Sequence, residues 1–386
     1  MKSLRHLDCF AGPGGICTGF TSAGIKTLGA IEKVPSCAMT YSANHPEVRV
    51  INKDIRSVKG SDLSPFVGKI DILTAGMPCE TFSTAGSTSR SFYDHRQSLY
   101  LEAIRLANAV KCEVILFENV PGITSKKTVK GGSIFVVDEI FAALKDSGFK
   151  HITDIILNAV DFGVPQSRQR FFILASKKAL SLTLPSKSVA FPTPVSVKDA
   201  LAGLPDVSAN SRNAGLSYEG KDSPFSRLMK DASFWGRDPE KAKLSYHLPP
   251  NHRPGTIERL KLIKPGEGLK DLFDRLGPKK VKELQAKKVL PNKWFIQRNR
   301  RLVATEPSCT VTSHCLDELV HPSAHRALTV REVARLQSFP DFYDFAGGPY
   351  ICPHISETQD KYEQVGDAVP PLLARAWALA IIDAIG

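Results

Sequence analysis

The first 150 residues alternate short apolar runs with amphipathic segments, and this alternation limits the fold more than any other feature of the chain. Five runs are expected as strands: residues 3–10, 27–32, 48–55, 69–76 and 113–120. Apolar residues at helical spacing lie between them, in residues 16–24, 35–46, 98–110 and 134–148. Strands that alternate with helices predict a parallel sheet covered by helices on both faces. We therefore expect an α/β fold with a doubly wound sheet.

The alternation stops near residues 184–197, where prolines interrupt the pattern. Between about residues 190 and 300 no regular rhythm of strands and helices is visible. Helical periodicity returns in residues 329–339, where a Thr or Asp is suited to cap the start, and in the apolar residues 371–386. These changes predict two domains, one formed by residues 1–189 together with 357–386, and a smaller one formed by residues 190–356.

Positive charge is concentrated in one part of the chain. The whole chain carries a formal net charge of +12, and residues 259–301 hold fourteen Lys or Arg against four Asp or Glu, a net charge of +10. A solvated helix face is the simplest explanation of a charged segment. Because the sign here is one-sided and Trp294 and Phe295 stand among the cations, a phosphate-binding surface is favoured. Nucleic acid is the first candidate partner.

The ends of the chain and the cysteines indicate a reduced, soluble protein. The first ten residues contain no apolar signal-peptide core, and residues 377–386 are too short to span a bilayer. The eight cysteines form no CxxC pair, so we expect free thiols rather than a disulfide framework. We expect no metal, because one set of residues matches no common zinc spacing: Cys309, His314, Cys315, His321, Cys352 and His354.

A glycine-rich turn follows the first predicted strand, in the sequence DCFAGPGG. Its glycines allow the backbone to turn sharply and to approach a ligand at the carboxyl end of the sheet. Glu32, after the second strand, is placed to accept hydrogen bonds from ribose hydroxyls, and Asp54 to hold an adenine amino group. No Walker lysine follows, and Asp8 would repel a polyphosphate. The turn therefore favours an adenosine without a phosphate chain, with a purely structural glycine turn as the alternative.

Cys79 stands after the fourth predicted strand, in TAGMPCETFSTAGSTSR, and Glu118 stands after the fifth. Both are expected at the same sheet edge as the glycine turn. A thiolate is a strong nucleophile, and nearby cations such as Arg168 and Arg170 lower the pKa of a thiol. On an extended segment these two arginines would point to one face. Each residue alone has a simpler explanation, as a packed thiol, a helix cap or a surface pair, but their joint position favours a catalytic site.

Seven motifs in order resemble those of the DNA (cytosine-5)-methyltransferase family. They are DCFAGPGG, GMPCETFS, DHRQSLYLEAIRL, FENV, VPQSRQRFFIL, RLVATEPSCTVT with HPSAHRALTVREVARLQSFPD, and YEQVGDAVPP. They lie in roughly the first 180 and the last 85 residues. The resemblance implies a doubly wound mixed sheet of the S-adenosylmethionine-dependent methyltransferase (Rossmann-like) type. It also implies that residues 190–356 form a target-recognition domain and hinge.

By this resemblance Cys79 attacks C6 of a cytosine flipped out of duplex DNA, and C5 takes a methyl group from S-adenosylmethionine. Glu118 contacts N3 and the exocyclic amine of the base, and Arg168 and Arg170 bind the base carbonyl and a nearby phosphate. A covalent thiol adduct divides one difficult step into easier ones. The flipped base must leave the stack, which costs a few kcal/mol.

The resemblance also implies two sets of binding residues. The cofactor-binding residues are Phe10, Gly12, Pro13, Gly14, Gly15, Glu32, Asp54, Ile55, Pro78, Leu99, Asp367 and Ala368. The DNA-binding residues are Ser83, Ala85, Gly86, Arg90, Arg96 and Gln166. The Ser/Thr/Gly run after Phe82 is expected to be a mobile catalytic loop that closes over DNA.

Two positions depart from the commonest form of the family. Glu80 replaces the usual Gln after the nucleophile, and an ionised carboxylate there would raise the thiol pKa. Asp367 replaces the usual Asn, and its charge favours the ammonium group of S-adenosylmethionine. Neither change removes a catalytic group.

Two other functions are weighed against sequence-specific DNA methylation. The first is transfer to cytosine C5 of RNA, such as tRNA, and the second is a catalytically silent DNA-binding regulator. A compact chain of this kind resembles a bacterial or phage modification enzyme, which implies a cytoplasmic, nucleoid-associated monomer. A cognate restriction endonuclease that acts separately is a further expectation. The recognition sequence is not readable from the chain.

Overall fold

The computed structural model describes residues 3–77, 98–127, 134–180, 184–188, 190–211, 217–237, 243–352 and 358–385. Its centre is a seven-stranded sheet with the order β3-β2-β1-β4-β5-β7-β6. The five strands expected from the apolar runs are present and parallel: β1 (Arg5–Cys9), β2 (Lys26–Ile31), β3 (Arg49–Ile51), β4 (Ile72–Gly76) and β5 (Val114–Asn119). The strand order reverses between β1 and β4, which places a ligand crevice at their carboxyl ends.

Two further strands complete the sheet and make it mixed. They are β6 (His151–Asn158) and β7 (Gln169–Ser176), and β7 runs antiparallel to both β5 and β6. The alternation of the first 150 residues predicts only the parallel part. The mixed sheet implied by the family resemblance is confirmed. The alternation of strands and helices did not reveal β6 and β7, because antiparallel neighbours need no crossover helix between them.

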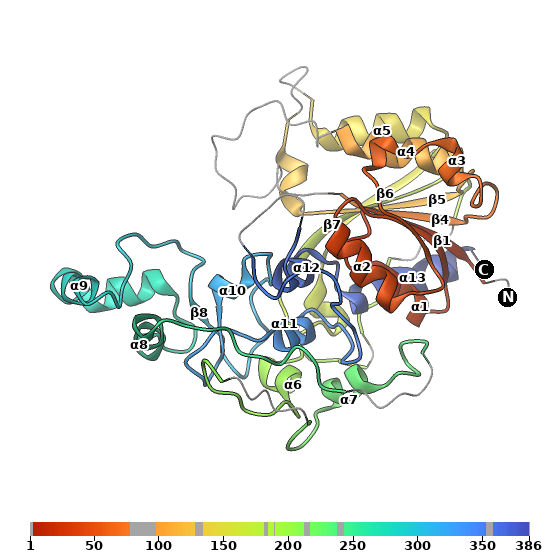
Figure 1. The fold of residues 1–386 in the computed structure, drawn as a ribbon. Helices are drawn as coiled ribbons and strands as arrows, with labels where there is room; N and C mark the ends of the chain where they lie inside the picture. Colours follow the sequence, from red (N-terminus) through yellow and green to blue (C-terminus); the bar gives the residue numbers. More distant parts are fainter. Residues whose placement is uncertain are drawn as a thin grey trace.

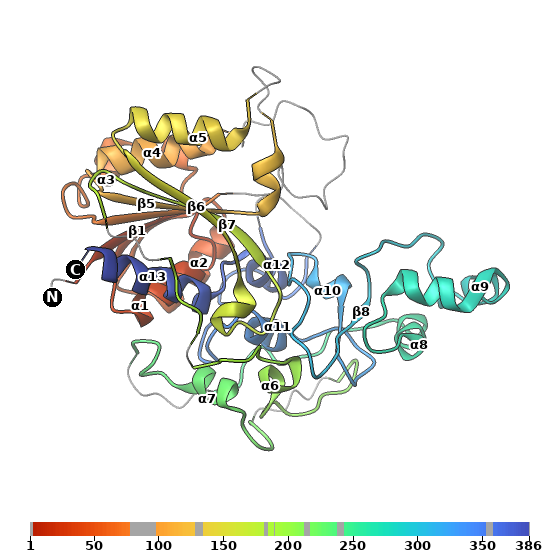
Figure 2. The same cartoon turned by 180° about the vertical axis from the view of Figure 1, so that it is seen from behind.

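Helices cover both faces of the sheet (Figures 1 and 2). One face carries α1 (Gly15–Ser22), α2 (Pro35–Asn44) and α13 (Pro371–Ile385), and the other carries α3 (Gly60–Leu63), α4 (Leu99–Ala109) and α5 (Val136–Asp146). Short 3₁₀ turns connect them at η1 (Ile55–Ser57), η3 (Pro121–Ser125) and η4 (Ala159–Phe162). Helices α1 and α13 come close because Gly19 lacks a side chain. A Cβ there would lie 2.3 Å from the carbonyl oxygen of Pro371.

The remaining elements lie below and beside the sheet (Figure 1). They are α6 (Val197–Leu201), α7 (Pro224–Lys230), α8 (Pro254–Leu262), α9 (Leu269–Ala286), β8 (Arg300–Arg301), α10 (Cys315–Glu318), β9 (Leu319–Val320), α11 (Val330–Leu336) and α12 (Lys361–Asp367). Strands β8 and β9 form a separate two-stranded parallel ladder. Helix α9 is two helices joined at a kink, where Gly277 has a φ of 72° and Pro278 follows.

The hydrophobic cores divide the chain differently from the expected boundary at residue 190. One core cluster joins Phe20 of α1 and Trp377 of α13 to Val197, Phe225 and Val333 from the expected second domain. A segment smaller than the expected second domain has a hydrophobic core of its own. It consists of α8, α9 and the residues that follow, which pack around Leu260, Leu272, Leu290 and their neighbours. Figure 2 shows this α8–α9 unit projecting from the body. The two-domain division therefore stays a prediction.

The last 25 residues of the described chain are long and apolar enough to cross a membrane by length and composition alone. This run, Lys361–Ile385, includes α12 and α13 and is therefore longer than the ten apolar residues that the sequence singles out. Trp377 and Ile381 of α13 are 1 % and 0 % exposed and belong to the main core. Helix α13 is accordingly a core helix in this fold.

Candidate active site

The glycine turn after β1 contains residues with positive φ angles, a conformation that glycine adopts more readily than other residues. Gly12 and Gly14 have φ angles of 54° and 101°, and Phe10 adopts a φ of 55° without being glycine. The Gly12 amide donates to Glu32 Oε2 at 2.7 Å, and the hydroxyl of Tyr343 donates to the carbonyl of Pro13. The turn is therefore tied to β2 on one side and to a residue more than 300 positions away on the other.

Glu32 lies directly after β2 and is buried beneath the turn. Its Oε1 accepts the Val34 amide at 2.6 Å, while Oε2 accepts the Gly12 amide. Burial raises the pKa of Glu32, and the two backbone amides oppose this shift. A carboxylate offers about four acceptor sites, and the backbone amides of Val34, Gly12 and Lys33 leave Glu32 with acceptor capacity to spare. No atom of the described residues lies within 4 Å of the place where a Cβ of Gly12 would point. An acceptor beside open space at a glycine turn fits the ribose of an adenosine cofactor.

Asp54 stands at the start of η1, three residues beyond the end of β3. It accepts the Arg56 amide at 3.0 Å and pairs with the Arg56 guanidinium at 2.6 Å. The hydrogen bond from Arg56 holds the pKa of Asp54 well below its usual range. Ile55 and Leu99, which are expected to line the same pocket, are 4 % and 8 % exposed and share one core cluster. The residues expected to bind adenine are therefore an ionised carboxylate and two buried apolar side chains.

A chain of hydrogen bonds runs beneath the turn from β2 to β4. Thr74 Oγ1 donates to Asp8 Oδ1 at 2.8 Å, so His6 Nε2, 2.7 Å from the same hydroxyl, carries the ring proton. His6 Nδ1 then accepts from Thr27 Oγ1 at 2.9 Å. Burial lowers the pKa of His6 to about 3 and raises the pKa of Asp8 to about 7. Near neutral pH Asp8 is therefore only partly ionised, so it repels a polyphosphate less than a fully charged carboxylate would.

Glu118 lies at the end of β5, at the edge where β4 also ends. It pairs in register with Gly76 of β4, and Cys79 follows Gly76 by three positions in the sequence. Arg170 of β7 contacts Glu118 through Nε and Oε1 at 2.8 Å, and each side chain is only 11 % exposed. A buried carboxylate and guanidinium thus stand together at the expected base-binding edge. Pro78, Cys79, Glu80, Ser83, Ala85, Gly86, Arg90 and Arg96 lie outside the described residues.

Gln166 and Arg168 are both buried. Gln166 is 0 % exposed, and its side-chain amide bonds Leu336, Gln337 and Val311 inside the protein. The expected DNA contact of Gln166 stays a prediction. Arg168 is 2 % exposed and donates to the carbonyls of Val311, Gly366 and Ala368. Arg168 precedes β7 and bonds these carbonyls, whereas Arg170 lies in β7 and contacts Glu118, so the recorded partners of the two arginines differ.

The turn between α12 and α13 carries the last two expected cofactor residues. Asp367 is exposed, and its Oδ2 accepts from Gln359 Nε2 at 2.8 Å. Ala368 is 5 % exposed and leaves the helical conformation, with φ −65° and ψ 149°. The next residue touches the glycine turn, since a Cβ on Gly15 would lie 2.2 Å from the carbonyl oxygen of Val369. The structure therefore brings the two ends of the chain together at this point.

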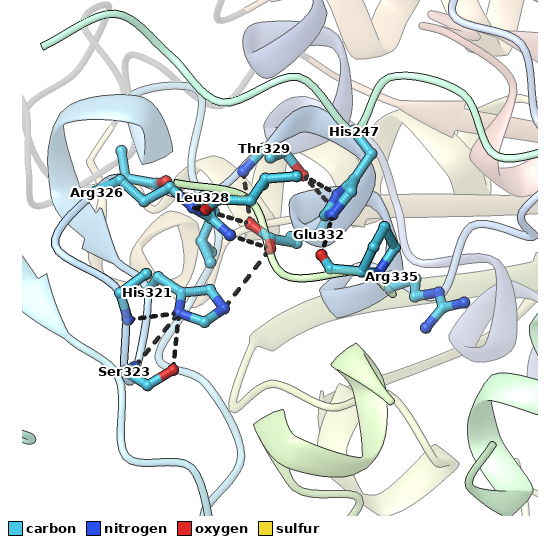
Figure 3. Close-up of polar contacts among 12 residues, drawn as sticks. His247, His321, Ser323, Arg326, Leu328, Thr329, Glu332 and Arg335 are labelled. Atoms are coloured by element: carbon cyan, nitrogen blue, oxygen red, sulfur yellow. Dashed lines mark hydrogen bonds and ion pairs between the residues drawn. The ribbon is translucent and has the colours of Figure 1, made fainter. Parts of the chain in front are cut away.

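Charged residues of α11 and of the segment before it form a buried network (Figure 3) that the sequence motifs did not predict as functional. Arg326 contacts both oxygens of Glu332, at 2.7 and 2.8 Å, and His321 Nε2 lies 3.6 Å from the same carboxylate. Burial alone would raise the pKa of Glu332, but the Arg326 guanidinium outweighs it and holds the pKa well below its usual range. Thr329 caps the helix and accepts the Glu332 amide at 3.2 Å. The Thr-x-x-Glu spacing is the one signal of this network in the sequence.

Two arginines of α11 extend the network to segments far away in the chain. Arg335 pairs with Asp341 at 2.7 Å and donates to the carbonyls of Ala200 and Ala202. Arg331 donates to the carbonyls of Ser245 and Tyr343. These contacts join α6 and residues 245–247 to the segment that supports the glycine turn.

Potential metal ligands gather at one place in the described part of the chain, around Cys352, Asp360 and Glu363. Asp360 Oδ1 accepts the Glu363 amide, and Glu363 Oε2 accepts the Asp360 amide. The two carboxylates are therefore the capping box of α12. His321 from the sequence-derived set is also occupied, since Nδ1 accepts the Ala324 amide at 2.9 Å.

The sheet order, the glycine turn with its acidic partner and the buried Glu118–Arg170 pair are the features of a methyltransferase of the Rossmann-like class. The family model described as C-5 cytosine-specific DNA methylase matches residues 4–383. The chain belongs to this family, and it is a DNA (cytosine-5)-methyltransferase. The family resemblance of the sequence motifs and the predicted fold class are thereby confirmed.

Curated and solved relatives agree with this assignment. The type II methyltransferase M.DdeI of Desulfomicrobium norvegicum is 35 % identical over 97 % of this chain and 88 % of its own length. The type II methyltransferase M1.HphI of Haemophilus parahaemolyticus is 29 % identical over 98 % of this chain and 87 % of its own. The crystal structure of a DNA modification methyltransferase encoded within a prophage (E. coli) superposes with a TM-score of 0.73, at 25 % identity over 99 % of both chains.

Proposed function

We propose that this enzyme methylates C5 of a flipped-out cytosine within a specific sequence of duplex DNA, using Cys79 as the nucleophile. The observation that carries the proposal is the buried Glu118–Arg170 pair, 2.8 Å apart, beside the end of β4, from which the chain leads to Cys79. A carboxyl group held beside a guanidinium has the donors and acceptors to recognise the polar edge of cytosine.

Each of the residues at this edge has a distinct task. The Cys79 thiolate adds to C6 and breaks the aromatic character of the ring, which makes C5 nucleophilic. Glu118 bonds N3 and the exocyclic amine and offsets the charge that develops on the base, and Arg170 orients Glu118 and binds the base carbonyl. Once C5 has taken the methyl group of the donor, loss of the C5 proton expels Cys79 and restores the ring as 5-methylcytosine.

We propose S-adenosylmethionine as the methyl donor, since its sulfonium centre supplies an electrophilic methyl group. Glu32 would bind the ribose, Asp54 and Ile55 the adenine edge, and Phe10 the adenine face. The turn from Gly12 to Gly15 and the Asp367–Ala368 turn would enclose the methionine end, with Leu99 and Pro78 lining the pocket. Two observations support this assignment: no described atom lies near the Cβ direction of Gly12, and the Glu32 carboxylate has acceptor capacity beyond its bonds to backbone amides.

We propose that the α8–α9 unit forms the part of the target-recognition domain that faces DNA. Its exposed lysines include Lys279, Lys282, Lys288 and Lys293, which make no ion pair with any residue that the structure describes. Trp294, Phe295 and Ile296 are 38 %, 64 % and 62 % exposed beside them. Exposed cations around apolar side chains suit a surface that binds phosphates and contacts base edges.

The wider role follows from the type II relatives. We propose a modification enzyme of a restriction–modification system, acting in the cytoplasm on nucleoid DNA as a monomer, with a cognate endonuclease as a separate protein. No metal takes part in the proposed chemistry. The family match favours DNA over RNA as the substrate.

A mechanism-based trap tests the catalytic proposal directly. Duplex DNA with 5-fluorocytosine at the target has no C5 proton to lose, so the wild-type enzyme is expected to remain covalently attached, whereas Cys79→Ala should release the DNA on denaturing gels. A silent DNA-binding regulator would give no adduct with either protein. Methyl incorporation into tRNA but not into duplex DNA would support the RNA alternative and contradict the proposal. Bisulfite sequencing of DNA from expressing cells then reads out the target sequence.

A further inference from the structure

We propose that Arg168 is a positioning residue for the cofactor side of the active site, and that it contacts neither the flipped base nor a phosphate. This inference rests on the proposed function, because it assigns a role within that active site. It differs from the role that the sequence motif implies, in which Arg168 and Arg170 both serve the substrate.

Both terminal nitrogens of the Arg168 guanidinium donate hydrogen bonds inside the protein. One terminal nitrogen donates to the carbonyl of Val311, and the other donates to the carbonyls of Gly366 and Ala368 at 3.0 and 3.2 Å. The backbone is fixed as well, since the Arg168 amide donates to Asn158 Oδ1 at 2.9 Å. Reaching a nucleotide would require these bonds to break, and it would leave buried carbonyls without a partner.

Two buried glutamines act with Arg168. Gln337 Nε2 donates to the carbonyls of Val365 and Ala368 at 2.7 and 3.2 Å, and Gln337 Oε1 accepts from Gln166 Nε2 at 2.6 Å. Gln166 and Gln337 are both 0 % exposed. We call Gln166, Arg168 and Gln337 the amide–guanidinium clamp.

The clamp binds at the carboxyl end of α12, where such donors are most needed. The last carbonyls of a helix have no partner within the helix and carry partial negative charge, which a cation stabilises. Helix α12 ends at Asp367, and its final carbonyls are those that Arg168 and Gln337 bind. A guanidinium has several donors in one plane, so Arg168 can hold two of these carbonyls at once.

The same turn is fitted tightly between its neighbours. A Cβ on Gly366 would lie 2.1 Å from the carbonyl oxygen of Thr312, and a Cβ on Gly15 would lie 2.2 Å from that of Val369. A shift of the turn therefore changes the distance between Asp367 and the glycine turn. By holding the carbonyl of Ala368, the clamp sets the geometry of the cofactor pocket, while Arg170 serves the base side through Glu118.

The test compares Arg168→Lys, which keeps the charge but loses the planar set of donors, with the exposed arginine variant Arg49→Lys as a matched control. The affinity for S-adenosylmethionine is measured by equilibrium binding without DNA, and the affinity for target duplex is measured at several salt concentrations. We expect Arg168→Lys to weaken cofactor binding about tenfold or more and to leave DNA affinity and its salt dependence unchanged. Arg49→Lys should change neither.

The opposite pattern overturns the inference. If Arg168 contacts a phosphate, DNA affinity falls and the slope of its logarithm against log salt becomes shallower by about 0.9, with cofactor affinity intact. Unchanged affinity for both ligands also contradicts it. If Arg168→Lys does not fold, Gln337→Ala removes one donor to Ala368 and should reproduce the selective loss of cofactor affinity in milder form. A wild-type protein that binds no S-adenosylmethionine would instead refute the proposed function.

Discussion

Helices α11 and α9 both carry several charged residues, but they use them in opposite ways. Arg331 and Arg335 of α11, together with Arg326 just before it, are 0–1 % exposed and bind carboxylates and backbone carbonyls. Lys279, Lys280 and Lys282 of α9 are exposed, and the ion pair of Lys280 with Glu283 lies at the surface. Buried charges around α11 hold the fold together, whereas exposed charges on α9 are available to a polyanion. Charge density alone therefore does not show what a charged helix does.

The largest effect on stability is expected from Glu332→Ala. It leaves the buried guanidinium of Arg326 without its carboxylate, and removal of one member of a buried ion pair costs about 3–5 kcal/mol. The free energy of unfolding, measured by urea denaturation, should fall accordingly. Glu283→Ala on α9 removes two surface ion pairs and is the matched control, with no measurable change expected. Equal losses in both variants would remove the distinction between the two helices.

A smaller effect on stability is expected from Gly15→Ala, since the added Cβ would lie 2.2 Å from the backbone oxygen of Val369. Such overpacking costs about 1–3 kcal/mol. Because the shifted backbone borders the proposed cofactor pocket, S-adenosylmethionine affinity should fall as well. Gly60→Ala, where nothing lies within 4 Å, is the control. Unchanged cofactor affinity in Gly15→Ala would show that the contact between the glycine turn and the α12–α13 turn does not shape the pocket.

Asp8 should affect stability only over part of the pH range. Burial raises its folded-state pKa from 3.8 to about 7, so the folded protein holds a proton that the unfolded chain has released between about pH 4 and 7. The contribution of Asp8 is fully present below pH 4 and is lost as pH rises through 7. His6, with its pKa lowered to about 3, has the opposite sign and loses stability as pH falls from 6.5.

Asp8→Asn separates these two contributions. The melting temperature of the variant, relative to wild type, should rise between pH 5 and pH 7 and level off above that. A difference that is independent of pH would mean that Asp8 is ionised in the fold throughout this range.

The smallest effect on stability is expected from the triple variant Lys279→Gln, Lys282→Gln and Lys288→Gln in the α8–α9 unit. These side chains are exposed, so the melting temperature should stay within about one degree of wild type. DNA affinity should fall, and its salt slope should become shallower by about 0.9 for each lysine that contacts a phosphate. An unchanged slope would place the DNA on another surface.

The parallel part of the fold was readable because each strand and helix repeats a local pattern. The five parallel strands, α1, α2, α4, α5 and α13 lie where apolar spacing predicts them. The hairpin of β6 and β7 was not predicted from periodicity, since β6 is half-exposed and β7 is buried along nearly its whole length, so neither shows a clear alternation. Likewise, the position of Glu118 followed from the strand order, but its ion pair with Arg170 depends on β7 joining the sheet beside β5.

By itself the sequence determined the family, the order of the motifs and the sheet edge at which Glu32, Glu118 and Cys79 are expected, because these properties depend on residue types and local periodicity. Tertiary structure decided which charged side chains face inward. Arg168 and Arg170 are two positions apart and chemically identical, yet one binds the end of α12 and the other binds Glu118. Their separation arises because Val311, Gly366 and Ala368 come from segments more than 140 residues away, and only the folded chain places those carbonyls around a single guanidinium.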